Sequence, residues 1–133
     1  MSPEIRDLWD RAVRAYTTAA RLVEEDPDAA ASRAYYAAFH AVSAYFALQG
    51  KEFTKHRGVE TAVHRELVKP GLWNPGFGAD YSLLVRLRTT GDYGGGLHIT
   101  PTEARTAVDK ALRLLQAVRL LSPSAFPPFE QPA

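Results

Sequence analysis

The amino-acid sequence predicts an all-α fold, an up-and-down bundle of four main helices with one shorter additional helix. Three observations lead to this prediction. Apolar residues recur at steps of three and four in several long segments, three of these segments begin with a capping residue followed by proline, and no segment shows the alternation typical of strands. We expect one helical domain over residues 1–121, followed by a proline-rich tail over residues 122–133 that is extended or frayed.

The first two helices are predicted from their capping residues. Ser2 followed by Pro3 is typical of a helix start, because the hydroxyl caps the helix and proline lacks an N–H that would have no partner there. The apolar stripe that follows extends for about six turns. Asp26 followed by Pro27 indicates the start of a second helix, which Gly50 ends. This second helix is apolar nearly all round, so we expect it at the centre of the bundle.

The middle of the chain is predicted to hold a short helix, a loop and a fourth helix. The short helix extends over about residues 55–68 and stops before a proline, and residues 70–79 are predicted to form a loop. Asp80 is predicted to cap the fourth helix, which ends near Gly91. Three consecutive glycines at 94–96 then predict a flexible joint.

The last helix has the clearest start in the sequence. Thr100, Pro101 and Glu103 form a capping box with proline at the first helical position. The apolar stripe of this helix continues to Leu121. We therefore expect it to complete the bundle as the fourth main helix.

Composition and charge exclude several classes of protein. Sixteen basic and fifteen acidic residues give a net charge of +1, which excludes a chain that coats nucleic acid through its overall charge. The absence of cysteine excludes disulfides and thiolate zinc sites. The longest apolar run contains Arg33 and His40 near its middle, so we expect a buried helix rather than a membrane span. The first residues lack the order of a secretory signal, and we expect a cytoplasmic protein.

Four polar residues share one face of the apolar second helix. Arg33, Tyr36, His40 and Ser43 follow one another at steps of three, four and three. One interpretation is that Arg33 pairs with a carboxylate of a neighbouring helix and His40 donates to a backbone carbonyl, since buried polar groups are usually paired. The other interpretation is a site for an anion or nucleotide. The first is favoured by these residues alone.

Metal and phosphate-loop motifs are weak in this sequence. His56, Glu60 and His64 are four residues apart, but two turns span about 12 Å, so the two histidines cannot hold one ion. A solvated helix face is the favoured interpretation, and we expect no metal site. The glycines at 94–96 follow no strand and precede no Gly-Lys-Ser/Thr, so they predict no phosphate loop and no cofactor.

The end of the fourth helix offers a second candidate site. One interpretation is a phosphate-binding site formed by Arg88, Asp92 and Tyr93. The other is that Arg88 pairs with Asp92 at i, i+4 while Tyr93 packs over the glycine joint. These two interpretations have equal support from the sequence. His98 lies near no Ser, Cys or Asp arrangement in the sequence and is interpreted as a surface loop histidine.

Three segments of the sequence resemble small prokaryotic HEPN-domain proteins. The segments are SRAYYAAFHAVSAYF at 32–46, KHRGV at 55–59 and RLRTTGDYG at 86–94. The resemblance covers most of residues 5–121. It implies a four-helix up-and-down bundle with a short extra helix, commonly a homodimer. Such proteins are often encoded beside a minimal nucleotidyltransferase in toxin–antitoxin pairs, so this enzyme is a candidate partner.

Many members of the wider HEPN superfamily are metal-independent endoribonucleases that use an arginine followed roughly four to six residues later by a histidine. The histidine moves protons at the ribose 2′-hydroxyl and the leaving oxygen, while arginine stabilises charge on phosphorus. In this sequence the fifth residue after Arg88 is Tyr93, and His98 comes ten residues after Arg88. Arg33 and His40 have six residues between them, but they lie in the second helix.

The resemblance therefore favours a module that binds a nucleotide, an RNA or a partner protein. Its candidate ligand contacts are Arg33, Tyr36, Lys55, His56, Arg88, Asp92 and Tyr93. The alternative is a metal-independent endoribonuclease with a non-standard site. In that case Arg88 would act with His98, or Arg33 with His40.

Overall fold

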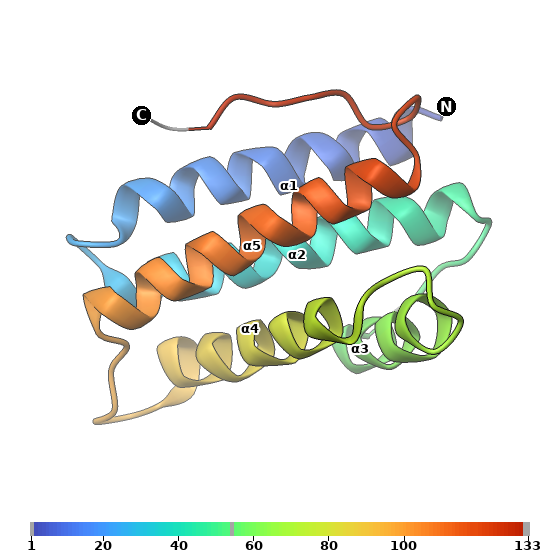
Figure 1. The fold of residues 1–133 in the computed structure, drawn as a ribbon. Coiled ribbons are helices and arrows are strands. Elements are labelled where there is room, and N and C mark those ends of the chain that lie inside the picture. Colours follow the sequence, from blue (N-terminus) through green and yellow to red (C-terminus); the bar gives the residue numbers. More distant parts are fainter. Residues whose placement is uncertain (1, 54, 132–133) are drawn as a thin grey trace.

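The computed structural model describes residues 2–53 and 55–131. These ranges contain four long helices, α1 (Pro3–Leu22), α2 (Pro27–Leu48), α4 (Pro75–Tyr93) and α5 (Pro101–Leu121), and a short α3 (His56–Ala62) that continues as the π-helical segment η1 (Val63–Val68). No strand occurs in them. Successive long helices run in opposite directions (Figure 1). The predicted all-α, up-and-down bundle with one short additional helix is confirmed.

Side-chain caps fix the three helix starts that the sequence predicted. The Ser2 hydroxyl accepts the backbone N–H of Ile5 at 3.3 Å, and the Asp26 carboxylate accepts that of Ala29 at 3.2 Å. At the start of α5 the capping box forms in full around Thr100. Each of these helices has proline at its first turn, where its missing N–H leaves no donor unpaired.

The predicted start of the fourth helix is wrong. The helix begins at Pro75, because Asn74 caps it and accepts a backbone N–H at 2.7 Å. Asp80 is therefore not a cap. It is a buried carboxylate in the helix interior, 3.2 Å from Lys110 Nζ and 3.7 Å from Arg113 Nη2 of α5. These ion pairs fasten α4 to α5.

Two glycines lie inside α4, one near its start and one near its end. Gly78 and Gly91 weaken the helical pattern in the sequence, yet both lie inside the helix. A Cβ at Gly78 would lie 2.8 Å from the side chain of Val68, and one at Gly91 would lie 2.8 Å from the backbone oxygen of Asp28. Close packing therefore requires glycine at both positions. The helix continues past Gly91 to Tyr93.

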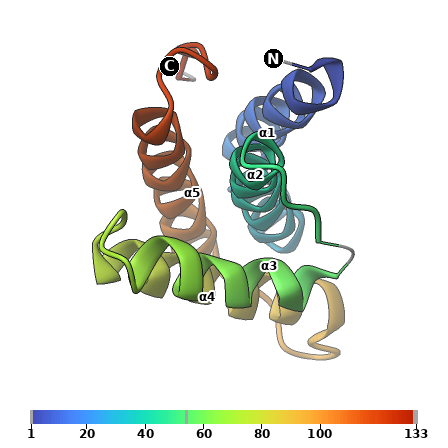
Figure 2. The ribbon, with the colours of Figure 1, turned by 90° about the vertical axis from the view of Figure 1, so that its right-hand side faces the viewer.

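Helix α2 occupies the centre of the bundle, as predicted. It contacts α1, α4 and α5 (Figure 2), and small side chains allow these close approaches. The buried alanines of α2 are Ala30, Ala31, Ala34, Ala37, Ala38, Ala41 and Ala44. In the part of the chain that the structure describes, no helix has the length and apolarity needed to cross a membrane.

The segment after α5 packs on the bundle. It makes a turn over residues 123–125 and then runs back beside α1 without regular secondary structure (Figure 1). Phe126 is fully buried, with its ring centroid 4.9 Å from that of Trp9, and Phe129 lies 5.9 Å from the ring of Tyr16. The prediction of an extended or frayed tail holds only from residue 127 onward, because a hydrogen-bonded turn precedes it; residues 132–133 lie outside the described residues.

Candidate functional site

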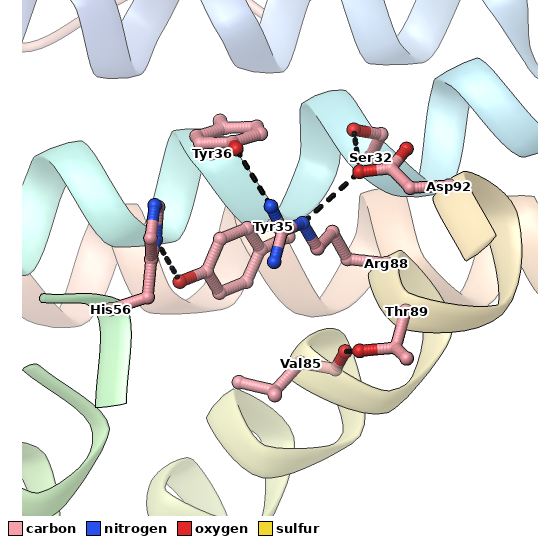
Figure 3. A network of polar contacts seen from close by, with 8 residues as sticks. All are labelled: Ser32, Tyr35, Tyr36, His56, Val85, Arg88, Thr89 and Asp92. Atoms are coloured by element: carbon pink, nitrogen blue, oxygen red, sulfur yellow. Dashed lines mark hydrogen bonds and ion pairs between the residues drawn. The ribbon is translucent and has the colours of Figure 1, made fainter.

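A network of polar contacts ties the end of α4 to α2 (Figure 3). Arg88 Nη2 donates to Tyr36 Oη at 3.0 Å, and Arg88 Nε donates to Asp92 Oδ2 at 3.1 Å. Ser32 Oγ donates to the same carboxylate at 3.3 Å. We call Ser32, Tyr36, Arg88 and Asp92 the Arg88 network. It fixes the guanidinium group in one position between the two helices.

Aromatic rings surround the Arg88 guanidinium. Its central carbon lies 5.3 Å from the ring centroid of Tyr35 and 5.5 Å from those of Tyr36 and Tyr93. The Arg88 side chain is 18% exposed, whereas Tyr93 is 71% exposed. Within the described residues Nη1 of Arg88 has no hydrogen-bond partner, and it is not a buried atom. The network therefore presents the free NH2 group of Nη1 beside an exposed aromatic ring.

His56 joins the same side of α2 from α3. Its Nδ1 lies 2.8 Å from Tyr35 Oη, and its ring lies 4.4 Å from the ring of Phe39. Burial, followed by the positive charge of Arg88, lowers the pKa of His56. Burial raises the pKa of Tyr35 to about 12. At neutral pH, therefore, His56 and Tyr35 are both uncharged, and the charges of this region are those of the Arg88–Asp92 ion pair.

His98 is bound to the first turn of α2. Its Nδ1 lies 2.7 Å from Asp28 Oδ2, while Asp28 Oδ1 accepts the backbone N–H of Ile99 at 2.7 Å. The bond from Ile99, and then that from His98, lowers the pKa of Asp28. Asp28 is four residues before Ser32, so the two contacts lie one turn apart on one face of α2. His98 and the Arg88 network therefore meet at the same end of α2.

Arg33 and His40 lack the partners that the favoured interpretation gave them. The central carbon of Arg33 lies 4.6 Å from the Tyr36 ring centroid, and no carboxylate in the described ranges forms an ion pair with it. His40 Nδ1 is buried and has no hydrogen-bond partner among the described residues. Burial, and then the charges of Arg11 and Arg33, lower the pKa of His40 to about 4. This imidazole is therefore neutral at neutral pH.

Comparison with known proteins decides the family. The model of the HEPN domain matches residues 5–121. This chain belongs to the HEPN family. A UPF0332 protein of Thermotoga maritima is 35% identical over 120 residues, which cover 89% of this chain and 91% of the relative. A UPF0332 protein of Gloeobacter violaceus is 30% identical over 118 residues, with 87% and 94% covered.

The HEPN bundle brings most of the candidate ligand contacts together. Arg88 bonds directly to both Tyr36 and Asp92. Arg33 lies over the Tyr36 ring, and the Tyr93 ring lies next to Arg88. The remaining candidates are His56, which reaches the network through Tyr35, and Lys55. Lys55 is exposed and lines a separate hollow of about 450 Å³ with Arg57 and Arg65.

His56 of α3 and His64 of η1 are exposed in this HEPN bundle, as the solvated-face interpretation predicts, and Glu60 is half-buried. Ser82 Oγ of α4 donates to Glu60 Oε2 at 2.9 Å and lies 3.0 Å from His64 Nε2. The shared hydroxyl fastens α4 to the short helix. No group of three metal-ligating side chains gathers anywhere in residues 2–53 and 55–131.

Sequence reasoning missed several residues that shape the HEPN site. Ser32 and Asp28 precede Tyr36 by one and two turns, so the helical spacing of the polar face could have included them. Tyr35 had no such signal, because it lies among apolar residues, which is typical of a core position. It is indeed buried, but its hydroxyl faces His56.

Proposed function

We propose that this HEPN protein is a binding module that recognises a nucleotide or RNA through the Arg88 network. The observation that carries the proposal is the fixed Arg88 guanidinium, with a free Nη1 next to the exposed ring of Tyr93. Arginine is well suited to phosphate, because its N–H groups match the phosphate oxygens. The exposed phenol ring offers a face on which a nucleobase stacks.

The low net charge of the chain supports recognition of a short ligand segment. A net charge of +1 provides little long-range attraction for a polyanion, so affinity depends on local contacts. The proposal extends to a cytoplasmic homodimer that pairs with a minimal nucleotidyltransferase of a toxin–antitoxin system. The HEPN family membership and the resemblance of the three sequence segments support this part of the proposal.

The test is binding of a fluorescent single-stranded RNA and of ATP to variants at Arg88 and Tyr93. We expect Arg88→Ala to weaken binding at least tenfold, because it removes the phosphate contact, and Tyr93→Ala to weaken it about fivefold to a hundredfold by removing a stacking partner. Arg86→Ala is the matched control, since Arg86 is an exposed arginine of the same helix outside the network. Equal binding by the Arg88 and Arg86 variants would overturn the proposal.

Cleavage of RNA without a metal ion is the second candidate function. It is favoured by the Asp28–His98 contact, because a carboxylate that holds an imidazole orients it for proton transfer. We expect a mixed RNA pool to be cleaved in EDTA, and cleavage to disappear in folded Arg88→Ala and His98→Ala variants. Cleavage lost instead in His40→Ala or Arg33→Ala would assign the activity to the other pair. No cleavage by the folded wild type would exclude this candidate and leave the binding module.

A further inference from the structure

A second basic cluster lies between α1 and α2. Arg11 and Arg14 of α1 face Arg33 and His40 of α2, and these side chains line a hollow of about 300 Å³ together with Ala15 and Thr18. A hollow of this volume is at the small end of the range for ligand sites, about 300–1,000 Å³. We call it the α1–α2 groove. Its lining combines three guanidinium groups with one imidazole.

The positive charges of the α1–α2 groove are poorly compensated. Arg11 pairs with Asp7 at 2.8 Å, and both side chains of this pair are more than half exposed. Arg14 and Arg33 form no ion pair with the residues that the structure describes. Three arginines with one carboxylate repel one another, and an anion between them would remove that repulsion.

His40 adds a hydrogen-bonding group without adding charge. Its ring lines the groove, and within the described ranges it makes no hydrogen bond. Because the imidazole is neutral at neutral pH, one of its nitrogens carries a proton that it can donate. The arginines therefore supply charge, and the histidine supplies a neutral donor next to them.

We propose that the α1–α2 groove is a second phosphate-binding site, in which Arg14 and Arg33 hold the anion and Arg11 and His40 border it. Clustered guanidinium groups with unused N–H donors match a phosphate, which takes two N–H bonds from each arginine. This inference is independent of the proposed function, because the groove shares no residue with the Arg88 network. Tyr36 separates the two sites, with Arg33 against its ring and Arg88 bound to its hydroxyl.

The phosphate group that binds in the groove can belong to a free anion, a nucleotide or an RNA backbone, and one experiment distinguishes these three ligands. Inorganic phosphate, ATP and a short single-stranded RNA are titrated separately into the wild-type protein, with calorimetry for affinity and NMR of the His40 ring for location. We expect at least one of these probes to bind and to shift the His40 resonance. Binding of inorganic phosphate assigns a free anion, while binding only of ATP or only of RNA assigns the nucleotide or the RNA backbone.

Variants distinguish the groove from other basic surfaces. Arg14→Glu and Arg33→Ala should each weaken binding of that probe at least tenfold, whereas Arg88→Ala should leave the shift of the His40 resonance intact. Arg21→Glu is the charge-matched control for Arg14→Glu, since Arg21 is an exposed arginine of α1 outside the groove. Arg14 is exposed, so its variant is expected to fold even if the Arg33 variant does not. The proposal fails if no probe shifts the His40 resonance, or if Arg14→Glu binds as Arg21→Glu does.

Discussion

The charge state of His40 is set by the residues around it. Burial has the largest effect on the pKa of this histidine, and Arg11 and Arg33 lower it further, while Asp7 acts in the opposite direction and His56 adds a small decrease. The folded-state pKa of about 4 lies well below the ordinary value of 6.5. Folding and protonation of His40 therefore oppose each other.

This opposition predicts that His40 makes the protein less stable in acid. Below about pH 6.5 His40 binds a proton in the unfolded chain but not in the folded chain. The His40 contribution to the free energy of unfolding therefore falls between pH 6.5 and 4 and does not change above pH 6.5. The difference of 2.5 pKa units corresponds to a loss of at most about 3 kcal/mol in the free energy of unfolding. Urea unfolding at pH 7, 5.5 and 4 measures this loss in the free energy of unfolding.

His40→Gln is the comparison for this pH dependence. Its unfolding free energy should fall less than that of the wild type over the same range, because glutamine keeps a polar side chain but does not titrate. Carboxylates titrate in both proteins and so cancel in the difference. Identical pH dependence in the two proteins would contradict the lowered pKa.

At the residue scale the sequence predicts local pairs better than distant ones. Arg88 and Asp92 are one helical turn apart, so their ion pair was foreseen as one of two alternatives. The bond from Arg88 to Tyr36 spans 52 residues and depends on how α4 lies along α2, which no local pattern specifies. For the same reason Arg11 and Arg14 were not recognised as neighbours of Arg33.

At the scale of helices, capping chemistry is the most reliable guide. Three predicted starts are confirmed because a capping side chain and a proline are local features. Asn74 followed by Pro75 is the same signal, but the glycines after it resemble a loop. The need for glycine comes from packing against Val68 and Asp28, so it is visible only in the fold.

The close approach of α4 to α2 predicts that Gly91→Ala destabilises the protein. The added Cβ would lie 2.8 Å from the backbone oxygen of Asp28, so one helix must move. We expect a loss of about 1–3 kcal/mol, although alanine alone favours a helix by about 1 kcal/mol. Urea unfolding measures the loss, and NMR of His98 should report a disturbed contact with Asp28.

Gly96→Ala is the matched control for this substitution. A Cβ at Gly96 meets no atom within 4 Å, and we expect a change of less than about 0.5 kcal/mol. If both variants unfold at the same urea concentration as the wild type, α4 does not approach α2 as closely as described.

At the scale of the whole molecule, the segment after α5 is part of the core. Phe126 fills a fully buried position against Trp9, and Phe129 covers the edge of the same cluster. The prolines of this segment predict that it is not helical, but they do not indicate what a neighbouring phenylalanine packs against. One hydrophobic cluster thus includes residues from both ends of the chain.

This packing predicts a large effect of Phe126→Ala. Removing a fully buried phenylalanine costs about 3–5 kcal/mol, and we expect a value in that range from urea or thermal unfolding. Leu120→Ala removes an apolar side chain that is 73% exposed and should change stability by less than about 0.5 kcal/mol. Similar small losses in both variants would show that the segment is detached in solution.

The Arg88 network also has a consequence for the entropy of ligand binding. A mobile arginine on a protein surface loses up to about 2 kcal/mol of rotamer entropy when a ligand orders it. Here Tyr36 and Asp92 impose that ordering when α2 and α4 pack together during folding. The guanidinium group is therefore already ordered when a phosphate binds. The entropy of this side chain is lost during folding and not during association.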